Sequence, residues 1–219
     1  MSRTIAIGDI HGCIAALETV LRAIDPRPED LLITLGDYVD RGPDSAGVVS
    51  RLIKLESQCR LVPILGNHEE VMLRAVAAGS GQPMTFWMVC GGDATLESYG
   101  TSLENIPAEH LDFLRNCRSY VETESHLFLH ANYHPHLPLN QQTAAQLRWT
   151  SLVQQRPAPH CSGKTAIVGH TSQKDGQVLD LGHLQCIDTY CYGGGWLTAF
   201  DVQAKQYWQA DRDGNLRTQ

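Results

Sequence analysis

Apolar residues in the first third of the chain form short continuous runs, and a longer stretch with helical spacing follows each run. The runs cover residues 4–10, 31–35 and 61–65, and the stretches that follow cover residues 13–24, 44–55 and 69–78. Continuous apolar runs rich in β-branched residues are typical of strands that are covered on both faces. Strands that alternate with helices predict an α/β sandwich with mainly parallel pairing in this part of the chain.

The pattern changes after a glycine- and proline-containing break at residues 79–83. Helical spacing then continues in three short segments, at residues 84–89, 93–99 and 108–116. Because these helices interrupt the strand pattern, we expect a helical cap over about residues 79–117, inserted into a single domain of residues 1–219.

The second half of the chain favours strands again, with one helix between them. Strands are predicted at residues 119–130, 164–170, 177–189 and 197–210, a helix at 141–149 and a turn at 193–195. The polar tail at 211–219 is expected to fray.

Composition and charge narrow the class of protein. The 219 residues are 42% hydrophobic and 19% charged, which is ordinary for a folded globular chain. The net charge of -7 and the absence of a basic block exclude nucleic acid as an expected partner. No apolar stretch is long enough to span a membrane, and none resembles a signal peptide. Seven scattered cysteines without a C-x-x-C pair fit reduced thiols, so we expect a cytoplasmic protein.

Residue types that bind metals follow each of the three early apolar runs. The sequences are GDIHG at residues 8–12, GDYVDRG at 36–42 and GNHE at 66–69. Two later apolar runs end in the same way, at His130 and His170. Ligands of α/β sheets gather at the carboxyl ends of the strands, so we expect all five clusters to meet there.

Each cluster alone has an ordinary explanation, as a capped turn or a hydrogen-bonded histidine. Five clusters of potential metal ligands at successive strand ends are not explained in this way. Together they predict a metal site. A mixture of carboxylate, amide and imidazole ligands suits manganese, iron or zinc. Two such ions ~3.5–4 Å apart could share one carboxylate and clamp a phosphate ester during displacement.

The ordered motifs GDIHG, GDYVDRG and GNHE, followed by His130-Ala131 and Gly169-His170-Thr171, resemble the signature of the phosphoprotein phosphatase superfamily of metallophosphoesterases. In size and in residues 169–172 and 194–198, the chain resembles the small bacterial and bacteriophage serine/threonine protein phosphatases. The resemblance implies a metallophosphoesterase-type two-sheet α/β sandwich that is flanked by helices and carries a small helical cap.

The resemblance also implies a role for each motif residue. One divalent ion would be bound by Asp9 and His11, and a second by Asn67, His130 and His170. Asp37 would bridge the two ions, with manganese the expected metal and iron or zinc the alternatives. A hydroxide activated by both metals would attack phosphorus directly, without a phosphoenzyme.

Proton transfer and phosphate binding are assigned to neighbouring motif residues by the same resemblance. His68 would protonate the leaving oxygen while Asp40 orients its ring, and Arg41 would grip two phosphate oxygens. Asn67 and His68 would also touch the phosphate.

The chain departs from the family pattern at two places. Relatives often carry an arginine just after the tryptophan at 149, whereas here Arg148 precedes it, so Arg148 or Arg156 would supply the second phosphate-binding arginine. Relatives often carry asparagine before the paired glycines of the cap, where this chain has Cys90. We expect the nearby Trp87 and Tyr99 to pack in the core or cap rather than to stack on a base.

Three functions are compatible with these residues. The first is a serine/threonine protein phosphatase, which could also accept phosphotyrosine or a small phosphate ester. The second is a nucleotide hydrolase of the diadenosine tetraphosphatase type, and the third is a catalytically inactive binding protein. The intact motifs disfavour the third function, and the modest length without an added base-binding domain favours the first.

Overall fold

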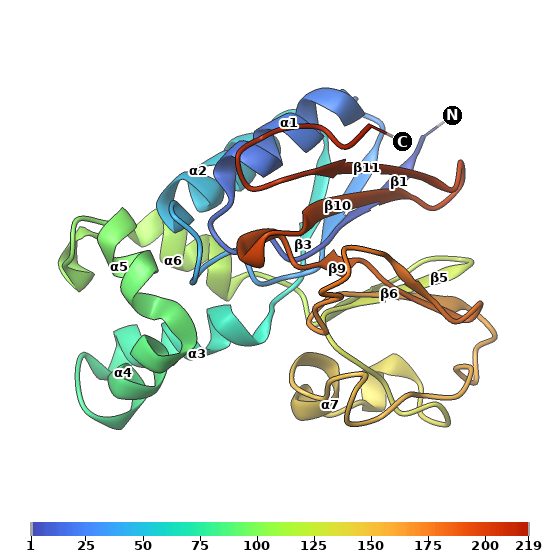
Figure 1. Ribbon diagram of the computed structural model, residues 1–219. Helices are drawn as coiled ribbons and strands as arrows, with labels where there is room; N and C mark the ends of the chain where they lie inside the picture. The colour runs from blue at the N-terminus through green and yellow to red at the C-terminus, as the bar shows by residue number, and fades with distance from the viewer. Residues whose placement is uncertain (1, 219) are drawn as a thin grey trace.

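The computed structural model describes residues 2–218, and it contains two sheets that face each other (Figure 1). In the first sheet, β1, β2 and β3 are parallel, whereas β10 runs antiparallel to β1 and pairs with β11 and β9. In order across this sheet, the strands are β11 (Gln206–Ala210), β10 (Trp196–Asp201), β1 (Thr4–Ile7), β2 (Leu31–Thr34) and β3 (Arg60–Pro63), with β9 (Asp188–Thr189) beside β10.

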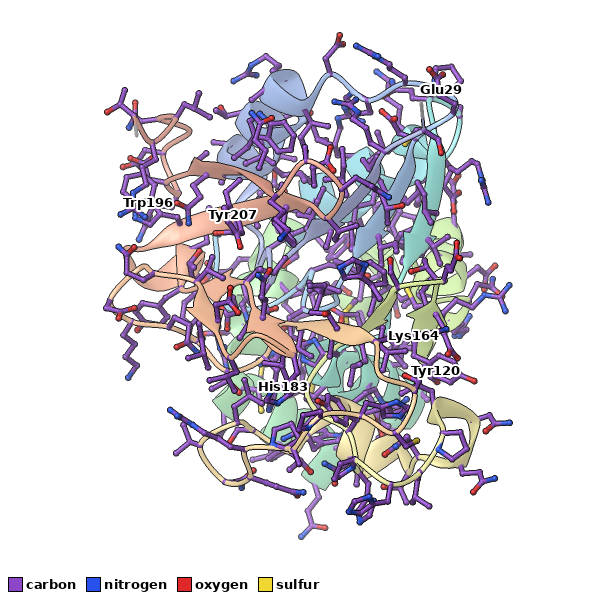
Figure 2. The ribbon with its side chains drawn as sticks, turned by 90° about the vertical axis from the view of Figure 1, so that its right-hand side faces the viewer. Glu29, Tyr120, Lys164, His183, Trp196 and Tyr207 are labelled. Atoms are coloured by element: carbon purple, nitrogen blue, oxygen red, sulfur yellow. The ribbon has the colours of Figure 1, made fainter. Side chains whose placement is uncertain are left out.

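The second sheet is built from later parts of the chain. Its inner strands are parallel, and each edge strand is antiparallel to its neighbour. In order, the strands are β4 (Tyr120–Glu122), β5 (His126–Leu129), β6 (Thr165–Val168), β8 (Leu184–Cys186) and β7 (Leu179–Asp180). Tyr207 of the first sheet donates a hydrogen bond to Gln185 of the second at 3.2 Å, and Figure 2 shows Tyr207 in the first sheet.

Helices cover the outer face of each sheet, so the predicted sandwich is confirmed. Helices α1 (Ile14–Ile24) and α2 (Ser45–Leu55) lie against the first sheet, and α7 (Ala144–Arg148) lies below the second (Figure 1). Ile5 and Ile7 pack in the core beneath the helices, whereas Ala6 between them packs in the core between the sheets. This two-sided burial explains why the early strands are apolar at every position.

The segment after α3 (Asn67–Ala78) is helical, as its spacing predicts, and it packs on α2 and α3. The π-helical turn η1 is kinked, because Gly91 has φ +98° inside it. The helices of this segment are α4 (Gln82–Trp87), η1 (Met88–Gly92), α5 (Asp93–Ser98), η2 (Leu103–Asn105) and α6 (Ala108–Arg115).

Local predictions differ from the structure at four places. The helix predicted at 141–149 is split into η3 (Leu139–Gln141) and α7, because the Thr143 hydroxyl caps a new helix by accepting from the Gln146 N–H. The strands predicted at 119–130 and 197–210 are the hairpins β4–β5 and β10–β11, and the strand predicted at 177–189 is divided into β7, β8 and β9.

The prediction that the tail frays is wrong for residues 211–218. Arg217 donates to the Gly176 carbonyl at 2.9 Å and lies over the Trp196 ring, 5.0 Å from its centroid. The Gly214 carbonyl accepts a hydrogen bond from Thr19 of α1, so the tail is tied to both a loop and a helix. No helix within residues 2–218 has both the length and the apolar character to cross a membrane.

Candidate active site

The six predicted ligands lie at one rim of the sandwich, beyond the carboxyl ends of strands from both sheets, five of them on loops and Asn67 at the first residue of α3. The segments after β1, β2 and β3 carry four of them, and the loops after β5 and β6 carry His130 and His170. Three of these side chains sit on backbone in the left-handed region, at His11 (φ +44°), Asp37 (φ +50°) and His170 (φ +62°). Such strained backbone is found where a site fixes the direction of its side chains.

The Asp37 carboxylate lies at the centre of the site and faces two histidines with its two oxygens. Asp37 Oδ2 is 3.5 Å from His11 Nε2, and Asp37 Oδ1 is 3.4 Å from His130 Nε2. Two groups of candidate ligand atoms share this aspartate: His11 with His68, both buried, and His130 with the partly buried His170. A carboxylate placed between two ligand groups has the geometry that bridging requires.

Backbone carbonyls fix the rings of the candidate histidine ligands. His11 Nδ1 lies 2.8 Å from the Val39 carbonyl, and His130 Nδ1 lies 2.7 Å from the Leu35 carbonyl. His170 is turned the other way, with Nε2 at 3.2 Å from the Trp149 carbonyl. A ring nitrogen that faces a carbonyl must donate, so the opposite nitrogen of each neutral ring keeps its lone pair for the site.

The lone pairs therefore converge without a proton between them. Asn67 Oδ1 lies 2.9 Å from both His130 Nε2 and His170 Nδ1, and each of these three atoms is an acceptor in the tautomers described above. Burial lowers the pKa of His11 to about 3 and the pKa of His170 to about 4, so both rings are neutral at pH 7. Converging acceptors repel one another unless a cation lies among them, which is what a metal site supplies.

The Asp9 carboxylate gives a second indication of a cation. Its Oδ2 accepts from the His170 N–H at 2.9 Å, but its buried Oδ1 has no hydrogen-bond partner among residues 2–218. Burial, together with the Asp188 and Asp37 carboxylates, raises the pKa of Asp9 well above its usual value. A buried carboxylate oxygen without a partner is costly, and a divalent ion would compensate it. The donor set therefore fits the two ions that the motifs predict.

His68 and Asp40 form a close pair beside the ligands. His68 Nδ1 lies 2.7 Å from Asp40 Oδ2, and His68 Nε2 faces Asp37 Oδ2 at 4.0 Å. Burial lowers the pKa of His68, but the Asp37 and Asp40 carboxylates outweigh burial, and the net direction is upward. The ring can therefore carry a proton on Nε2, on the side that faces the ligand cluster.

Arg41 also reaches the site. It donates to His11 Nε2 at 3.1 Å, and its guanidinium carbon lies 4.8 Å from the centroid of the Tyr192 ring. The Tyr192 ring also contacts His11 edge-on, with centroids 4.8 Å apart. Tyr192 lies beside the three glycines that the sequence indicates only as a turn, so pattern alone did not reveal this contact.

Arg148 makes an ion pair beside the Trp149 indole. Arg148 Nε lies 2.7 Å from Glu70 Oε2, which also accepts from the Trp149 indole at 3.2 Å. Arg156 is exposed. The identity of the second phosphate-binding arginine therefore stays a prediction, because Arg148 would have to leave Glu70 to reach a phosphate.

Glu69 holds the two central motif loops together, a role that the sequence did not suggest. Its buried carboxylate accepts from the backbone N–H groups of Asp37 at 2.9 Å, Tyr38 at 2.7 Å and Gly66 at 3.0 Å. A Cβ at Gly66 would lie 2.2 Å from Asp37 Oδ1, so only glycine fits there. The glycine and the glutamate of the GNHE motif thus position Asp37.

Comparison with known proteins agrees with this geometry, because residues 2–185 match the model of the calcineurin-like phosphoesterases. The chain belongs to this family of metallophosphoesterases. A serine/threonine-protein phosphatase 1 from Salmonella typhimurium is 30% identical over 208 residues, which are 90% of each chain. A symmetrical bis(5'-nucleosyl)-tetraphosphatase from an Acidovorax species is 47% identical, but over 78 residues, which are 35% of this chain and 27% of that protein.

Several solved structures share the fold. A candidate diadenosine tetraphosphatase superposes with a TM-score of 0.73 at 24% identity, covering 95% of this chain and 93% of that chain. A cold-active protein-tyrosine phosphatase from a psychrophilic Shewanella species superposes with a TM-score of 0.70 at 17% identity, covering 100% and 80%. At these identities the likeness concerns the fold alone.

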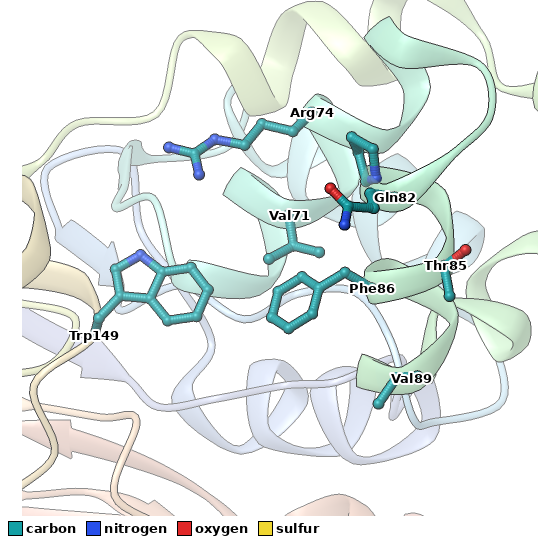
Figure 3. A pocket seen from close by; sticks show the side chains of 8 residues that line it. Val71, Arg74, Gln82, Thr85, Phe86, Val89 and Trp149 are labelled. Carbon is teal, nitrogen blue, oxygen red and sulfur yellow. The ribbon is translucent and has the colours of Figure 1, made fainter.

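A groove of about 550 Å³ opens beside this metallophosphoesterase site, between α3, α4 and Trp149 (Figure 3). Val71 on its floor is one helical turn beyond Asn67, and the Trp149 carbonyl faces His170. Phe86 is 51% exposed and points toward Trp149 across Val71. The groove therefore borders the helix that carries Asn67 and the residue whose carbonyl faces His170.

Proposed function

We propose that this metallophosphoesterase hydrolyses phosphoserine and phosphothreonine in proteins with two divalent ions bound at the Asp37 centre. The observation that carries the proposal is the convergence of the acceptor atoms of Asn67, His130 and His170 beside Asp37, together with the Asp9 oxygen that has no hydrogen-bond partner within residues 2–218. The relative that aligns with 90% of this chain is a serine/threonine phosphatase, which supports the substrate class.

The ligands divide into two groups around the shared carboxylate. Asp9 and His11 would hold one ion with Asp37, and Asn67, His130 and His170 would hold the other with Asp37. Manganese is the expected metal, and iron or zinc are the alternatives. Divalent ions bound there would neutralise phosphate charge and lower the pKa of bound water.

The other residues of the site would bind phosphate and move a proton. The Arg41 guanidinium would take two phosphate oxygens as a planar fork, with Tyr192 supporting it from one face. As an oxygen of water bonds to phosphorus, the bond to the leaving oxygen would break, its electrons would go to that oxygen, and His68 would give it the Nε2 proton. Asp40 would hold the other ring nitrogen and stabilise the charged ring before the transfer.

The groove beside the site supports a peptide rather than a base as the neighbouring group. Its walls are mainly apolar, and most of its polar side chains already have protein partners. Thr85 donates to the Gly81 carbonyl, and Arg74 pairs with Glu70. A base would need polar partners for its edges, whereas an apolar side chain next to a phosphoserine would need none. We further propose that the helical segment at about 79–117 acts as a specificity cap through this groove.

A second function, cleavage of dinucleoside polyphosphates, is favoured by the 47% identity to the Acidovorax tetraphosphatase over its shorter alignment. A substrate panel separates the two functions. The manganese-loaded protein would be given phosphoserine, phosphothreonine and phosphotyrosine peptides, diadenosine tetraphosphate and an aryl phosphate, and kcat/KM would be measured for each.

We expect the highest kcat/KM among the biological substrates for phosphoserine or phosphothreonine peptides. Phe86→Ala should lower kcat/KM for peptides with an apolar flanking residue by about 10-fold, roughly the value of one buried apolar contact, and leave the aryl phosphate unchanged. A preference for diadenosine tetraphosphate over every peptide would overturn the protein-phosphatase assignment, while leaving the metal site intact.

A further inference from the structure

The two oxygens of the buried Asp40 carboxylate have different partners. Oδ2 lies 2.7 Å from His68 Nδ1, whereas Oδ1 accepts hydrogen bonds from Trp87 Nε1 and Thr95 Oγ1, each at 2.8 Å. Asp40, Trp87 and Thr95 all have 0% exposure. Because a carboxylate is planar, the two hydrogen bonds that fix Oδ1 also fix the direction in which Oδ2 meets the histidine ring.

Thr95 holds the backbone of Asp40 as well as its side chain. The Asp40 N–H donates to Thr95 Oγ1 at 2.8 Å and to Ser45 Oγ at 3.1 Å, and the two hydroxyls lie 2.9 Å apart. Asp40 has φ +70°, in the left-handed region that non-glycine residues rarely adopt. The two hydroxyls therefore stabilise a backbone conformation that the chain would otherwise disfavour.

The kink in η1 explains how the Trp87 indole reaches Asp40. A Cβ at Gly92 would lie 2.6 Å from three atoms of the indole ring, so the ring packs directly on the glycine backbone. The carbonyl of Gly91 accepts from the Arg41 N–H at 3.0 Å, and a Cβ at Gly91 would lie 2.9 Å from Arg41 Cγ. The paired glycines thus fit the cap against both Asp40 and Arg41.

We propose that Trp87 and Thr95 are positioning residues for proton donation. Their hydrogen bonds to Asp40 Oδ1, called the clamp below, hold the carboxylate so that Oδ2 orients His68 toward the leaving oxygen. This inference rests on the proposed function, because it assumes that His68 is the proton donor. Neither residue would touch the substrate or a metal, and both would act through Asp40. The helical segment would then complete the catalytic machinery in addition to contacting the substrate.

The clamp should matter only where the leaving oxygen needs a proton. An alkoxide such as that of serine is a poor leaving group, whereas an activated aryl oxide carries its charge without help. Trp87→Phe keeps an aromatic ring but removes the donor, and Thr95→Val keeps the shape but removes the hydroxyl. Loss of a hydrogen bond to a charged group corresponds to ~10–100-fold in rate.

The test is steady-state kinetics on phosphate monoesters whose leaving groups range from activated aryl to alkyl, with metal content measured for every variant. We expect kcat of each variant to fall ~10–100-fold on a phosphoserine peptide and less than about threefold on the aryl phosphate, with KM and metal content unchanged. Trp208→Phe, at a partly buried tryptophan of β11, is the matched control and should change neither rate.

A double-mutant cycle with His68→Asn distinguishes the clamp from a general effect on folding. In the His68→Asn background, neither Trp87→Phe nor Thr95→Val should slow the alkyl substrate further. Equal losses on alkyl and aryl phosphates, or a further loss in that background, would overturn the clamp. If Trp87→Phe does not fold, Thr95→Val alone still tests the clamp by the same comparison of alkyl and aryl phosphates.

The same cycle separates this inference from the function on which it rests. If His68→Asn itself shows no dependence on the leaving group, the assignment of His68 as proton donor fails. If His68→Asn shows that dependence and the two clamp variants do not, the clamp alone fails.

Discussion

Two buried aspartates at opposite ends of the first sheet have opposite surroundings. Asp30 lies just before β2, at the amino ends of the parallel strands, and its carboxylate accepts from the Arg3 side chain, the Arg3 N–H and the Arg27 N–H. Asp9 lies after β1, at the carboxyl ends, where one of its oxygens has a single backbone donor and the other has no partner in residues 2–218.

The pKa values follow the partners rather than the burial. Burial raises the pKa of Asp30, but hydrogen bonds from Arg3 and Arg27 outweigh it and bring that pKa down to about 2. Burial raises the pKa of Asp9, and the single hydrogen bond from the His170 backbone N–H lowers it by less. One end of the sheet thus uses an aspartate for stability, while the other end keeps an aspartate under-satisfied, as a site for a cation requires.

The largest effect is expected at the aspartate shared by both ligand groups. Asp37→Asn removes a charge that faces two histidines, so both ions should bind weakly. Metal ions contribute several kcal/mol to the stabilisation of the transition state, so kcat/KM should fall by ~10³-fold or more. Metal content, measured on the purified variant by elemental analysis, should fall with it.

Metal removal is the control for this variant. Excess chelator should abolish turnover of the wild-type protein, manganese should restore it, and manganese should raise the Tm of the wild-type protein but not that of Asp37→Asn. Near-native metal content and rate in Asp37→Asn would show that this carboxylate does not bridge two ions.

The next largest effect is expected for His68, the proposed proton donor, which lies at the same end of the sheet. His68→Asn should slow alkyl phosphates by ~10²–10⁴-fold, the usual size of general acid catalysis, and slow an activated aryl phosphate clearly less. The measurement is kcat on both substrates, with metal content unchanged. Loss of a metal ion in this variant would instead identify His68 as a ligand.

The comparison of the two aspartates itself predicts opposite effects on stability in metal-free protein. Asp30→Asn removes charge-assisted hydrogen bonds and should lower the free energy of unfolding by ~2–3 kcal/mol. Asp9→Asn removes an under-satisfied buried charge and should leave the Tm unchanged or raise it. Thermal unfolding after dialysis against chelator tests both, and a lower Tm for Asp9→Asn than for Asp30→Asn would contradict the comparison.

A smaller effect is expected from pH. The pKa of Asp30 in the folded protein, about 2, lies below its ordinary value of 3.8. Its stabilisation is therefore complete above about pH 4 and is lost as the pH falls toward 2. The free energy of unfolding of both proteins, measured after metal removal as the pH is lowered, tests this. The wild type should lose its higher stability over Asp30→Asn in this range. A stability difference that stays constant down to pH 2 would exclude a salt bridge to Arg3.

The sequence by itself determined the sandwich and the metal-binding chemistry. The apolar runs of β1, β2 and β3 and their glycine-flanked polar ends are local patterns, and parallel pairing brings such ends to one edge. The helices at residues 84–116 were likewise predicted from spacing. His130 and His170 were candidates because each follows an apolar run directly, although only the second sheet places them opposite Asp37.

Only the tertiary structure decided what the side chains outside these motifs contact. Trp87 and Thr95 meet Asp40 across about 50 residues of chain, through a kink at Gly91 that no periodicity reveals. The docked tail, held by Arg217 at the Gly176 loop, and the pairing of Arg148 with Glu70 depend in the same way on contacts between distant segments. Spacing encodes which face of an element is buried, but the partner of a polar group is fixed only when separate elements pack together.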